Sequence, residues 1–248
     1  ALRSIGGFGV AVACLSVAAT AAVVVVVPEP AQPAGIDLRC CSVADLLADM
    51  PGPPSLIIAD PPWHYSQAPG TASPDLIYDT VTDRQIAYML DDAYNLSSDA
   101  RLVVWCTWPK LGEWWTAAQS VGFRWKYKTG GSWHKKPNAG VGYHWLGNSE
   151  IALVYVKGSP GIKWGSLSNA HENERQKHSE KPAGWMAQWI ERWTEPGDLI
   201  LDLFAGMAPA ARAVKMAGGG RRYVGAEIDP ERYRQAVDRL ALDGWSNR

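Results

Sequence analysis

The stretch Leu56-Ile57-Ile58-Ala59-Asp60-Pro61-Pro62-Trp63 decides the fold, because a short apolar run ends abruptly in an acid and two prolines. Four consecutive apolar residues bounded in this way are typical of a strand that is buried on both faces, as in a parallel sheet. Proline cannot donate to a strand ladder, so the strand should end at Ala59. We therefore expect Asp60 at the carboxyl end of a strand, where open α/β sheets bind their ligands.

The rest of the chain alternates between apolar runs and helical patterns. Further strands are expected at residues 36–40, 101–107, 151–156, 199–203 and 223–226. Helices are expected at residues 42–50, 82–95, 110–121, 182–194, 209–217 and 230–242, several of them opened by a capping residue or a proline. Residues 126–148 are rich in Gly, Lys and Trp and are predicted to be a large loop or mobile hairpin. The alternation predicts an α/β fold, with a mostly parallel sheet and helices on both faces.

Composition excludes several classes of protein. The 248 residues are 47% hydrophobic and 20% charged, values that argue against a disordered or fibrous chain. The four cysteines form no C-x-x-C pair and have no histidine at ligand spacing, so neither a structural zinc nor a disulfide framework is expected. We expect no metal, a reducing compartment and a cytoplasmic location.

Residues 1–35 differ from the remainder. No charged side chain occurs from Ser4 to Pro28, and the apolar stretch is long enough to span a bilayer, so membrane contact through residues 5–27 stays open. A signal peptide, an upstream extension, or a buried strand at 23–27 preceded by a short helix are the alternatives. Residues 28–35 have three prolines and predict an extended linker. One functional domain is expected over residues 36–248.

The residues Asp60 to Trp63 suit an unusual chemistry. The exocyclic amine of a nucleobase is a poor nucleophile, because its lone pair is delocalised into the ring. A carboxylate from Asp60 and the carbonyl of Pro61, each accepting one N–H, would favour a pyramidal amine that can attack. Trp63 would offer a flat face to a base that has left its stack. The alternative is a strand-ending turn with Trp63 in the core.

A second constellation lies near the C-terminus. A predicted strand ends in Phe204-Ala205-Gly206, a helix and another strand follow, and Glu227 comes 21 positions after Gly206. This order is typical of nucleotide binding, with the acid gripping a ribose. The G-x-G-x-x-G phosphate cradle is missing, so an adenosyl ligand without pyrophosphate fits better than NAD or FAD. S-adenosylmethionine is the cofactor that this pattern predicts, and an ordinary solvated acid is the alternative for Glu227.

These features resemble the MT-A70-like family of adenine N6-methyltransferases, in the permuted β-group of amino-methyltransferases. The resemblance covers residues 36–242 and does not extend to residues 1–35. It implies a Rossmann-like S-adenosylmethionine-dependent methyltransferase fold. It is carried by Asp60-Pro61-Pro62-Trp63, with Phe204-Ala205-Gly206 downstream, and by Tyr78-Asp79-Thr80, Val104-Trp105-Cys106-Thr107, Gly122-Phe123, Trp133-His134-Lys135, Glu150-Ile151-Ala152-Leu153 and His178-Ser179-Glu180-Lys181-Pro182.

The resemblance assigns roles to individual residues. Asp60 would hold the target amine beside the cofactor, Pro61 and Pro62 would shape the base pocket, and Lys181 would pair with the methionine carboxylate. Residues that would bind the cofactor also include Phe204, Ala205, Gly206 and Glu227. Cys41 and Ser42 are also counted among the cofactor-binding residues, because they stand where many relatives carry an acid that contacts the cofactor adenine, a contact that would pass to Ser42. Ala208 stands where relatives often have glycine.

The substrate is expected to be nucleic acid. Residues 36–100 carry 2 basic and 10 acidic side chains, whereas residues 101–181 carry 12 and 5 and contain eight of the thirteen tryptophans. Basic residues interleaved with aromatics fit a phosphate backbone with splayed bases. Within a substrate-binding insertion around residues 124–148, four lysines form the densest cluster. The predicted substrate contacts are Trp63, His64, Tyr65, Lys126, Lys128, Lys135 and Lys136.

We therefore predict methylation of the N6 amine of adenine in nucleic acid, with DNA favoured and RNA open. The alternatives are cytosine N4 methylation in DNA and a catalytically silent nucleic-acid-binding subunit. A homo- or heterodimer also stays open.

Overall fold

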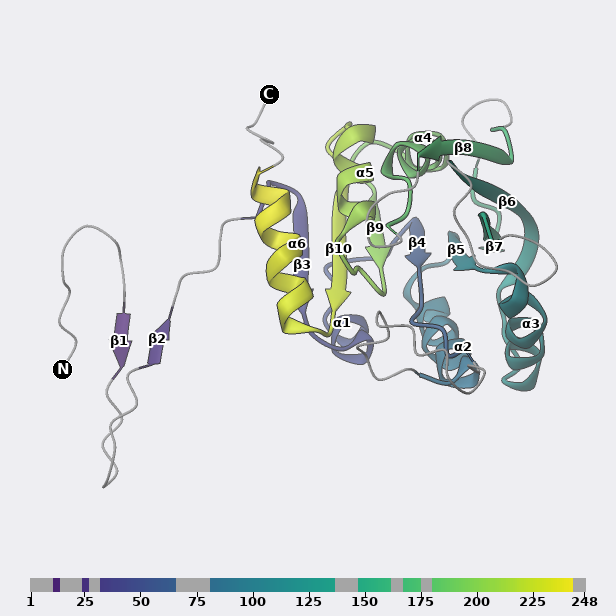
Figure 1. Ribbon diagram of the computed structural model, residues 1–248, viewed down its shortest axis with the longest axis horizontal. Helices are drawn as coiled ribbons and strands as arrows, with labels where there is room; N and C mark the ends of the chain where they lie inside the picture. Colours follow the sequence, from purple (N-terminus) through teal and green to yellow (C-terminus); the bar gives the residue numbers. More distant parts are fainter. Residues whose placement is uncertain are drawn as a thin grey trace, which may run out of the picture.

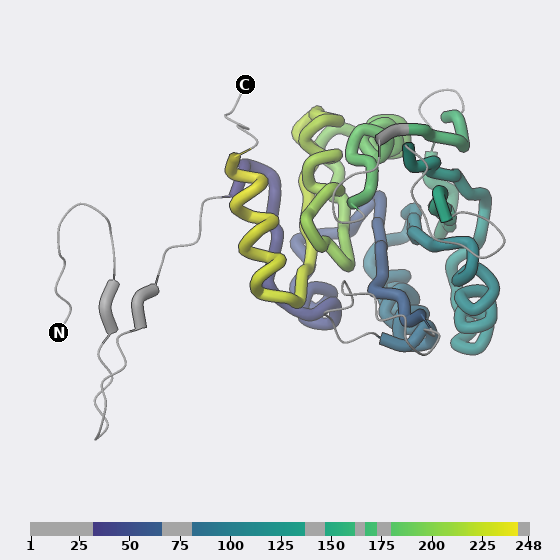
Figure 2. The backbone as a smooth tube through the Cα atoms, viewed as in Figure 1, coloured from purple at the N-terminus to yellow at the C-terminus, as the bar shows by residue number. Residues whose placement is uncertain are grey.

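The computed structural model describes residues 11–13, 24–26, 32–65, 81–136, 147–161, 167–174 and 180–242. Near the N-terminus, β1 (Ala11–Ala13) and β2 (Val24–Val26) pair antiparallel as a two-stranded sheet of their own. The main domain begins with β3 (Ile36–Cys40), and its first strand and last helix, α6 (Pro230–Leu242), lie side by side (Figure 2). Within the described ranges, no helix is long and apolar enough to cross a membrane.

An eight-stranded sheet forms the centre of the domain, in the order β3-β10-β9-β4-β5-β7-β6-β8 (Figure 1). Only β7 runs against the other seven strands, so the prediction of a mostly parallel sheet is confirmed. The bounds of the strands that follow β3 are β4 (Leu56–Ala59), β5 (Ala100–Cys106), β6 (Lys126–Lys136), β7 (Ser149–Lys157), β8 (Ala170–Glu174), β9 (Leu199–Asp202) and β10 (Arg222–Glu227).

Helices cover both faces of the sheet. One apolar core lies between the sheet and α4 (Ala183–Trp193), α5 (Pro209–Ala217) and α6. A second core lies between the other face and α1 (Val43–Ala48), α2 (Asp83–Asp92) and α3 (Leu111–Ser120). Two 3₁₀ turns, η1 (Ala93–Leu96) and η2 (Trp108–Lys110), complete the described elements. Both faces of the central strands are therefore buried, as the apolar run of β4 predicts.

Local sequence explains where the helices begin. Thr82 caps α2 through a capping box, in which its hydroxyl accepts from the Gln85 backbone and the Gln85 side chain accepts from the Thr82 backbone. Ser42 caps α1 by accepting from the Asp45 backbone at 3.2 Å, as predicted. A proline occupies the first turn of α5, behind Ala208.

Of the two forms predicted for residues 126–148, the large loop is wrong for Lys126–Lys136, which forms the long strand β6 and pairs antiparallel with β7. The strand pairs with β7 on one side and with β8 on the other. Gly131 is required there because a Cβ atom on it would lie 2.9 Å from the ring of Trp185. Residues 137–146 lie outside the described part of the chain.

Candidate active site

Asp60 follows β4, at the point in the sheet where the chain connections from two neighbouring strands lead to opposite sides. From β4 the chain continues through α2 to β5 on one side, whereas β9 leads through α5 to β10 on the other. Neighbouring strands whose connections diverge leave a crevice at their carboxyl ends, which is the usual ligand site of an open α/β sheet. Strands β4 and β9 are in register at Ile58 and Asp202, so the residues after them meet at this edge.

A chain of four charged side chains extends from Asp60 into the protein. Lys181 Nζ lies 2.6 Å from Asp60 Oδ2 and 3.1 Å from Glu150 Oε2. The other oxygen of Glu150 accepts from Lys135. The side chains of Lys181, Glu150 and Lys135 are each at most 10% exposed, whereas that of Asp60 is 37% exposed. The two lysines and two carboxylates balance in charge, with Asp60 at the accessible end.

In this row of four charged side chains, each partner opposes the effect of burial on the pKa of its neighbour. Burial raises the pKa of Asp60, and the Lys181 ammonium opposes that rise. Burial also favours neutral forms of Glu150 and Lys181, but their charged partners outweigh it: Lys181 and then Lys135 lower the pKa of Glu150, and Asp60 and then Glu150 raise that of Lys181. Lys181 also lies 5.5 Å from the centre of the Trp105 ring. The predicted pairing of Lys181 with a cofactor carboxylate stays a prediction, since here its partners are protein carboxylates.

The three residues after Asp60 form a tight, buried turn. The Pro61 carbonyl accepts from the Trp63 backbone at 2.8 Å, so one of its two lone pairs is left for a ligand amine. Pro62 is partly exposed. Trp63 is only 6% exposed; its indole donates to the Trp105 carbonyl at 3.0 Å and packs edge-on against Trp114. The flat face that the sequence led us to expect from Trp63 is therefore covered by protein, and the core alternative describes its position.

The turn after β9 has the geometry of a ligand cradle. Gly206 has a positive φ of 54°, and a Cβ atom built on it would meet nothing within 4 Å. Its backbone N–H donates to Glu227 Oε2 at 2.8 Å, so the acid at the end of β10 holds the turn. The other oxygen of Glu227 accepts from the Asp229 backbone at 2.9 Å. Phe204 and Ala205 complete the turn, with Ala205 bonded to the Ala226 carbonyl.

Ala208 and the pair Cys41 and Ser42 are the other positions in this region that the sequence singled out. Ala208, where the resemblance implies glycine, adopts the left-handed conformation with φ 54°, which glycine accommodates more easily. Cys41 and Ser42 follow β3, and the Ser42 hydroxyl is engaged with Asp45, donating to its carboxylate at 2.6 Å. Burial raises the pKa of the Cys41 thiol.

The lysines that the sequence groups together lie at opposite ends of the sheet. Lys126 is aligned through Val156 with Arg101, at the amino end of β5, and Lys128 is close to it. Lys135 and Lys136 end β6 at the carboxyl edge, about 30 Å away if nine strand residues are counted. Lys135 is buried against Glu150, whereas Lys136 is 58% exposed and pairs with Glu172 at 2.5 Å. The structure therefore separates the predicted cluster.

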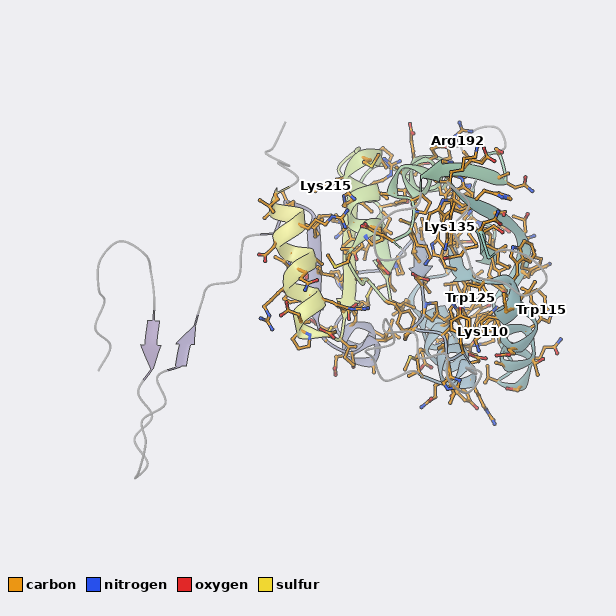
Figure 3. All side chains as sticks on the ribbon, in the orientation of Figure 1. Lys110, Trp115, Trp125, Lys135, Arg192 and Lys215 are labelled. Carbon is orange, nitrogen blue, oxygen red and sulfur yellow. The ribbon has the colours of Figure 1, made fainter. Side chains whose placement is uncertain are left out.

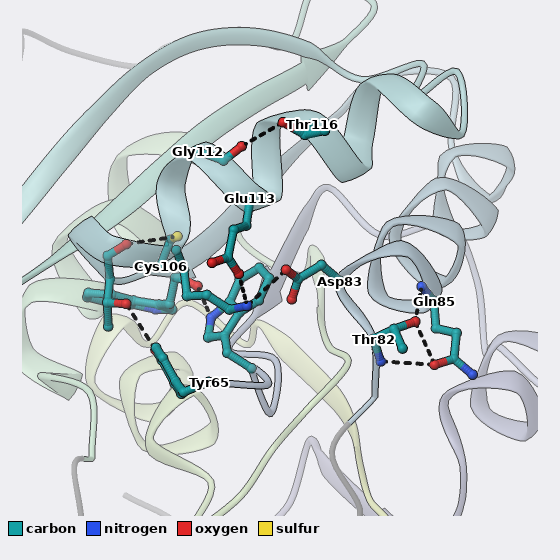
Figure 4. A network of polar contacts seen from close by, with 12 residues as sticks. Tyr65, Thr82, Asp83, Gln85, Cys106, Gly112, Glu113 and Thr116 are labelled. Carbon is teal, nitrogen blue, oxygen red and sulfur yellow. Dashed lines mark hydrogen bonds and ion pairs between the residues drawn. The ribbon is translucent and has the colours of Figure 1, made fainter. Parts of the chain in front are cut away.

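Tyr65 lies in a polar network beside the site (Figure 4). Its hydroxyl is 3.0 Å from Thr107 Oγ1, and Lys110 Nζ is 5.6 Å from its ring centre. Lys110 in turn binds Asp83 at 2.9 Å and Glu113 at 2.5 Å. His64 is exposed beside Tyr65. These contacts hold Tyr65 in place beside the site.

Three charged residues at the site escaped the sequence analysis of the functional residues. Glu150 appeared there only as part of a resemblance, although a lone acid ahead of the apolar run 151–156 is a usable signal for a buried partner. Asp202 ends β9 and accepts from the Tyr223 hydroxyl at 3.0 Å; burial raises its pKa to about 7. Glu180 binds Arg239 at 2.6 Å and thereby fixes the backbone before Lys181.

A cavity of about 310 Å³ lies at the other end of the sheet. It is lined by residues around the amino ends of β4, β5 and β9, among them Ser55, Arg101 and Asp198. It is therefore separate from Asp60. In the part of the chain that the structure describes, no cluster of three or more His, Cys, Asp or Glu residues could hold a metal ion.

Comparison with known proteins gives this geometry a context. Residues 159–238 match the family model for DNA methylases of the N6/N4 type. YubD from Escherichia coli (strain K12), a protein named as a methylase, is 27% identical over 166 residues, which cover 64% of this chain and 70% of YubD.

Solved structures share the fold. The structure of the M1.HpyAVI–SAM complex matches with a TM-score of 0.63 and 19% identity, over 83% of this chain and 98% of that one. The cytosine-N4-specific PvuII DNA methyltransferase matches with a TM-score of 0.62 and 14% identity, over 89% and 92% of the two chains. The chain has the Rossmann-like fold of S-adenosylmethionine-dependent methyltransferases. The family match over residues 159–238 is to the N6/N4 DNA methylases, so the MT-A70-like resemblance stays an expectation.

Proposed function

We propose that this protein transfers a methyl group from S-adenosylmethionine to the exocyclic amine of a base in DNA, with adenine N6 as the favoured target. The observation that carries the proposal is the position of Asp60. Its partly exposed carboxylate follows β4, while Gly206 and Glu227 follow the next two strands of the same sheet edge. A group that activates an amine and a turn that suits an adenosyl ligand are thus adjacent.

The turn fits the cofactor. The open space over Gly206 allows a ligand to approach the backbone closely, which a side chain would prevent. Each oxygen of Glu227 accepts one backbone N–H and keeps a lone pair that can accept from a ribose hydroxyl. When bound, S-adenosylmethionine supplies an electrophilic methyl group on a sulfonium. The family match and the M1.HpyAVI complex support this cofactor.

The protein activates and orients the amine. Asp60 accepts one N–H, and the remaining lone pair of the Pro61 carbonyl accepts the other, so the nitrogen lone pair is directed away from the ring. Lys181 opposes the rise in the pKa of Asp60 and so favours the carboxylate form that can accept. As the new N–C bond forms, the S–C bond breaks and the nitrogen releases a proton, which the Asp60 carboxylate can receive. Orientation of the reacting groups alone can lower the activation free energy by about 7–11 kcal/mol.

Adenine is favoured by the MT-A70-like resemblance of residues 60–63. Cytosine N4 is the second candidate, because the cytosine-N4-specific PvuII enzyme shares this fold, with a TM-score of 0.62. The fold therefore does not distinguish the two bases. DNA is the substrate that the family match and the name of the PvuII enzyme support.

Methyl-labelled S-adenosylmethionine tests the proposal. The full chain is incubated separately with single-stranded DNA, duplex DNA and RNA, and the nucleosides are then separated and identified by mass spectrometry. We expect label in N6-methyldeoxyadenosine. Label in N4-methyldeoxycytidine would support the methyl transfer but show that cytosine is the target base. Label found only in RNA would show that RNA, and not DNA, is the substrate. Calorimetric binding of S-adenosylmethionine without any transfer would favour a silent subunit.

A further inference from the structure

Two exposed aromatic rings stand at the edge of the sheet that carries Asp60. Trp108 is 55% exposed and Tyr65 is 37% exposed. Trp108 opens η2 directly after β5, the strand beside β4, and Tyr65 lies on the segment that follows β4. The Tyr65 hydroxyl contacts Thr107, the residue before Trp108. The two rings are thus linked at the carboxyl ends of adjacent strands.

The Trp108 ring has a fixed orientation. Its indole N–H donates to Ser149 Oγ at 2.9 Å. Ser149 opens β7 and precedes Glu150, which binds the lysine partner of Asp60. Trp108 is therefore connected to the active site by a short run of contacts, while more than half of its side chain remains accessible.

Among the tryptophans that the structure describes, only Trp108 and Trp115 are exposed, and Trp108 is the more exposed of the two. Trp105, Trp114 and Trp133 are completely buried, and even Trp63, the aromatic residue of the Asp60 turn, is only 6% exposed. An indole ring loses favourable burial when it faces water, so a fixed, open tryptophan beside a ligand site suits a partner with a flat face.

A positive charge accompanies the aromatic edge. His134 on β6 is in register with Ser149; Lys136, two residues further, is 58% exposed at the same end of the strand and pairs there with Glu172, which is 56% exposed and can be replaced by a phosphate. A cation that can contact a phosphate beside a ring that can stack on a base is the combination with which proteins bind an unpaired nucleic-acid strand.

We propose that Trp108 is a stacking platform for the base next to the target base in the substrate DNA strand. The inference rests on the proposed function, because it takes the target amine to lie at Asp60. Trp63 cannot serve this purpose, since its ring is covered. Trp108 lies at the rim, so it receives a neighbouring base of an unpaired strand.

A double-mutant cycle between protein and DNA tests the proposal. A randomised single-stranded pool first identifies the context that the wild-type chain methylates. Oligonucleotides of that context are then made with an abasic site on the 5′ or the 3′ side of the target. The variants are Trp108→Ala, Trp108→Phe and, as matched control, Trp115→Ala, which removes an indole that is 39% exposed on α3 (Figure 3).

Loss of one base stack should lower kcat/KM of Trp108→Ala by roughly 5- to 150-fold. We expect Phe to restore most of that loss, Trp115→Ala to change nothing and the affinity for S-adenosylmethionine to stay constant. An abasic site on one flank should reduce the wild-type rate by a similar factor and add no further loss in Trp108→Ala.

Two results would overturn the stacking role: additive losses at both flanks, or equal rates for Trp108→Ala and Trp115→Ala.

If the wild-type chain transfers no methyl group, the proposed function fails instead. The same cycle is then measured as binding of fluorescent oligonucleotides of one fixed sequence, with and without abasic sites flanking a single adenine. If the affinity losses from Trp108→Ala and from the abasic site add at both flanks, the stacking platform is excluded. If they do not add at one flank, the platform is supported.

Discussion

Replacing Lys181 by Met removes the cation shared by two buried or half-buried acids. Lys181 is 2.6 Å from Asp60 and 3.1 Å from Glu150, and after its removal only Lys135 faces the two carboxylates. Breaking a buried ion pair in this way costs about 3–5 kcal/mol. Asp60 is 37% exposed and keeps some water, so we take the lower end, about 3 kcal/mol. For a chain of this length that loss lowers Tm by about 6–12 °C.

The loss should depend on pH, and the sign follows from the carboxylates. Lys181 lowers the pKa of Glu150 and opposes the rise in the pKa of Asp60. Without it, both folded-state pKa values rise above those of the unfolded chain, so the acids destabilise the variant once they ionise. The loss is therefore full at pH 8 and shrinks as the pH falls toward 5. Below that range the wild-type chain also loses the contribution of ionised Glu150.

Thermal and denaturant unfolding of wild type and Lys181→Met at pH 8 and pH 5 measures this effect. Lys136→Met is the matched control, because its lysine is 58% exposed and should contribute little. An unfolding free energy that falls equally at both pH values, or not at all, would refute the proposed charge balance.

Two other substitutions test the nucleotide-binding side of the sheet. Burial raises the pKa of Asp202 to about 7, so its contribution to stability is complete at pH 4 and is lost as the pH rises through 7. The difference in unfolding free energy between pH 4 and pH 8 should therefore be smaller in Asp202→Asn, by up to about 4 kcal/mol. An unchanged difference would contradict the raised pKa. Gly206→Ala places a methyl group in the cradle at φ 54°, and should weaken S-adenosylmethionine binding at least roughly tenfold in calorimetry while destabilising the fold by about 1–2 kcal/mol. Gly197→Ala, also at positive φ with open space but at the amino end of β9, should destabilise similarly and leave binding unchanged; equal effects on binding would place the ligand elsewhere.

Much of the fold could be predicted because its elements have strong local signals. The helices 209–217 and 230–242 have the predicted bounds, since a proline marks the first turn of each. The strands 36–40 and 56–59 also have the predicted bounds: the first alternates apolar and polar residues, and the buried apolar run of the second stops at Asp60 and two prolines.

Strands β6 and β8 could not be predicted, because their signals are weak. β6 contains Gly130, Gly131 and five lysine or histidine residues, a composition that favours a loop. Its extended form depends on pairing with β7 and on the space under Trp185, which only the folded sheet supplies. β8 has almost no apolar residues.

The candidate site was predictable where chain order alone brings residues together. Asp60 and Gly206 follow strands and Glu227 ends one, so a parallel sheet brings them to one edge. The burial of Lys135 was not predictable, because it depends on the register that sets Trp133 opposite Glu150 and on the contact between Lys135 and that acid. The stacking face expected of Trp63 was replaced by core packing for the same reason, since a sequence does not show which side of a ring meets protein.

The measurement that tests the central claim most directly is methyl transfer by Asp60→Ala. The side chain is partly exposed, so its removal leaves no large cavity, and circular dichroism can confirm the fold. With labelled S-adenosylmethionine and the DNA that the wild-type chain methylates, we predict loss of transfer while calorimetry shows cofactor binding largely intact. Full activity in Asp60→Ala would contradict the account.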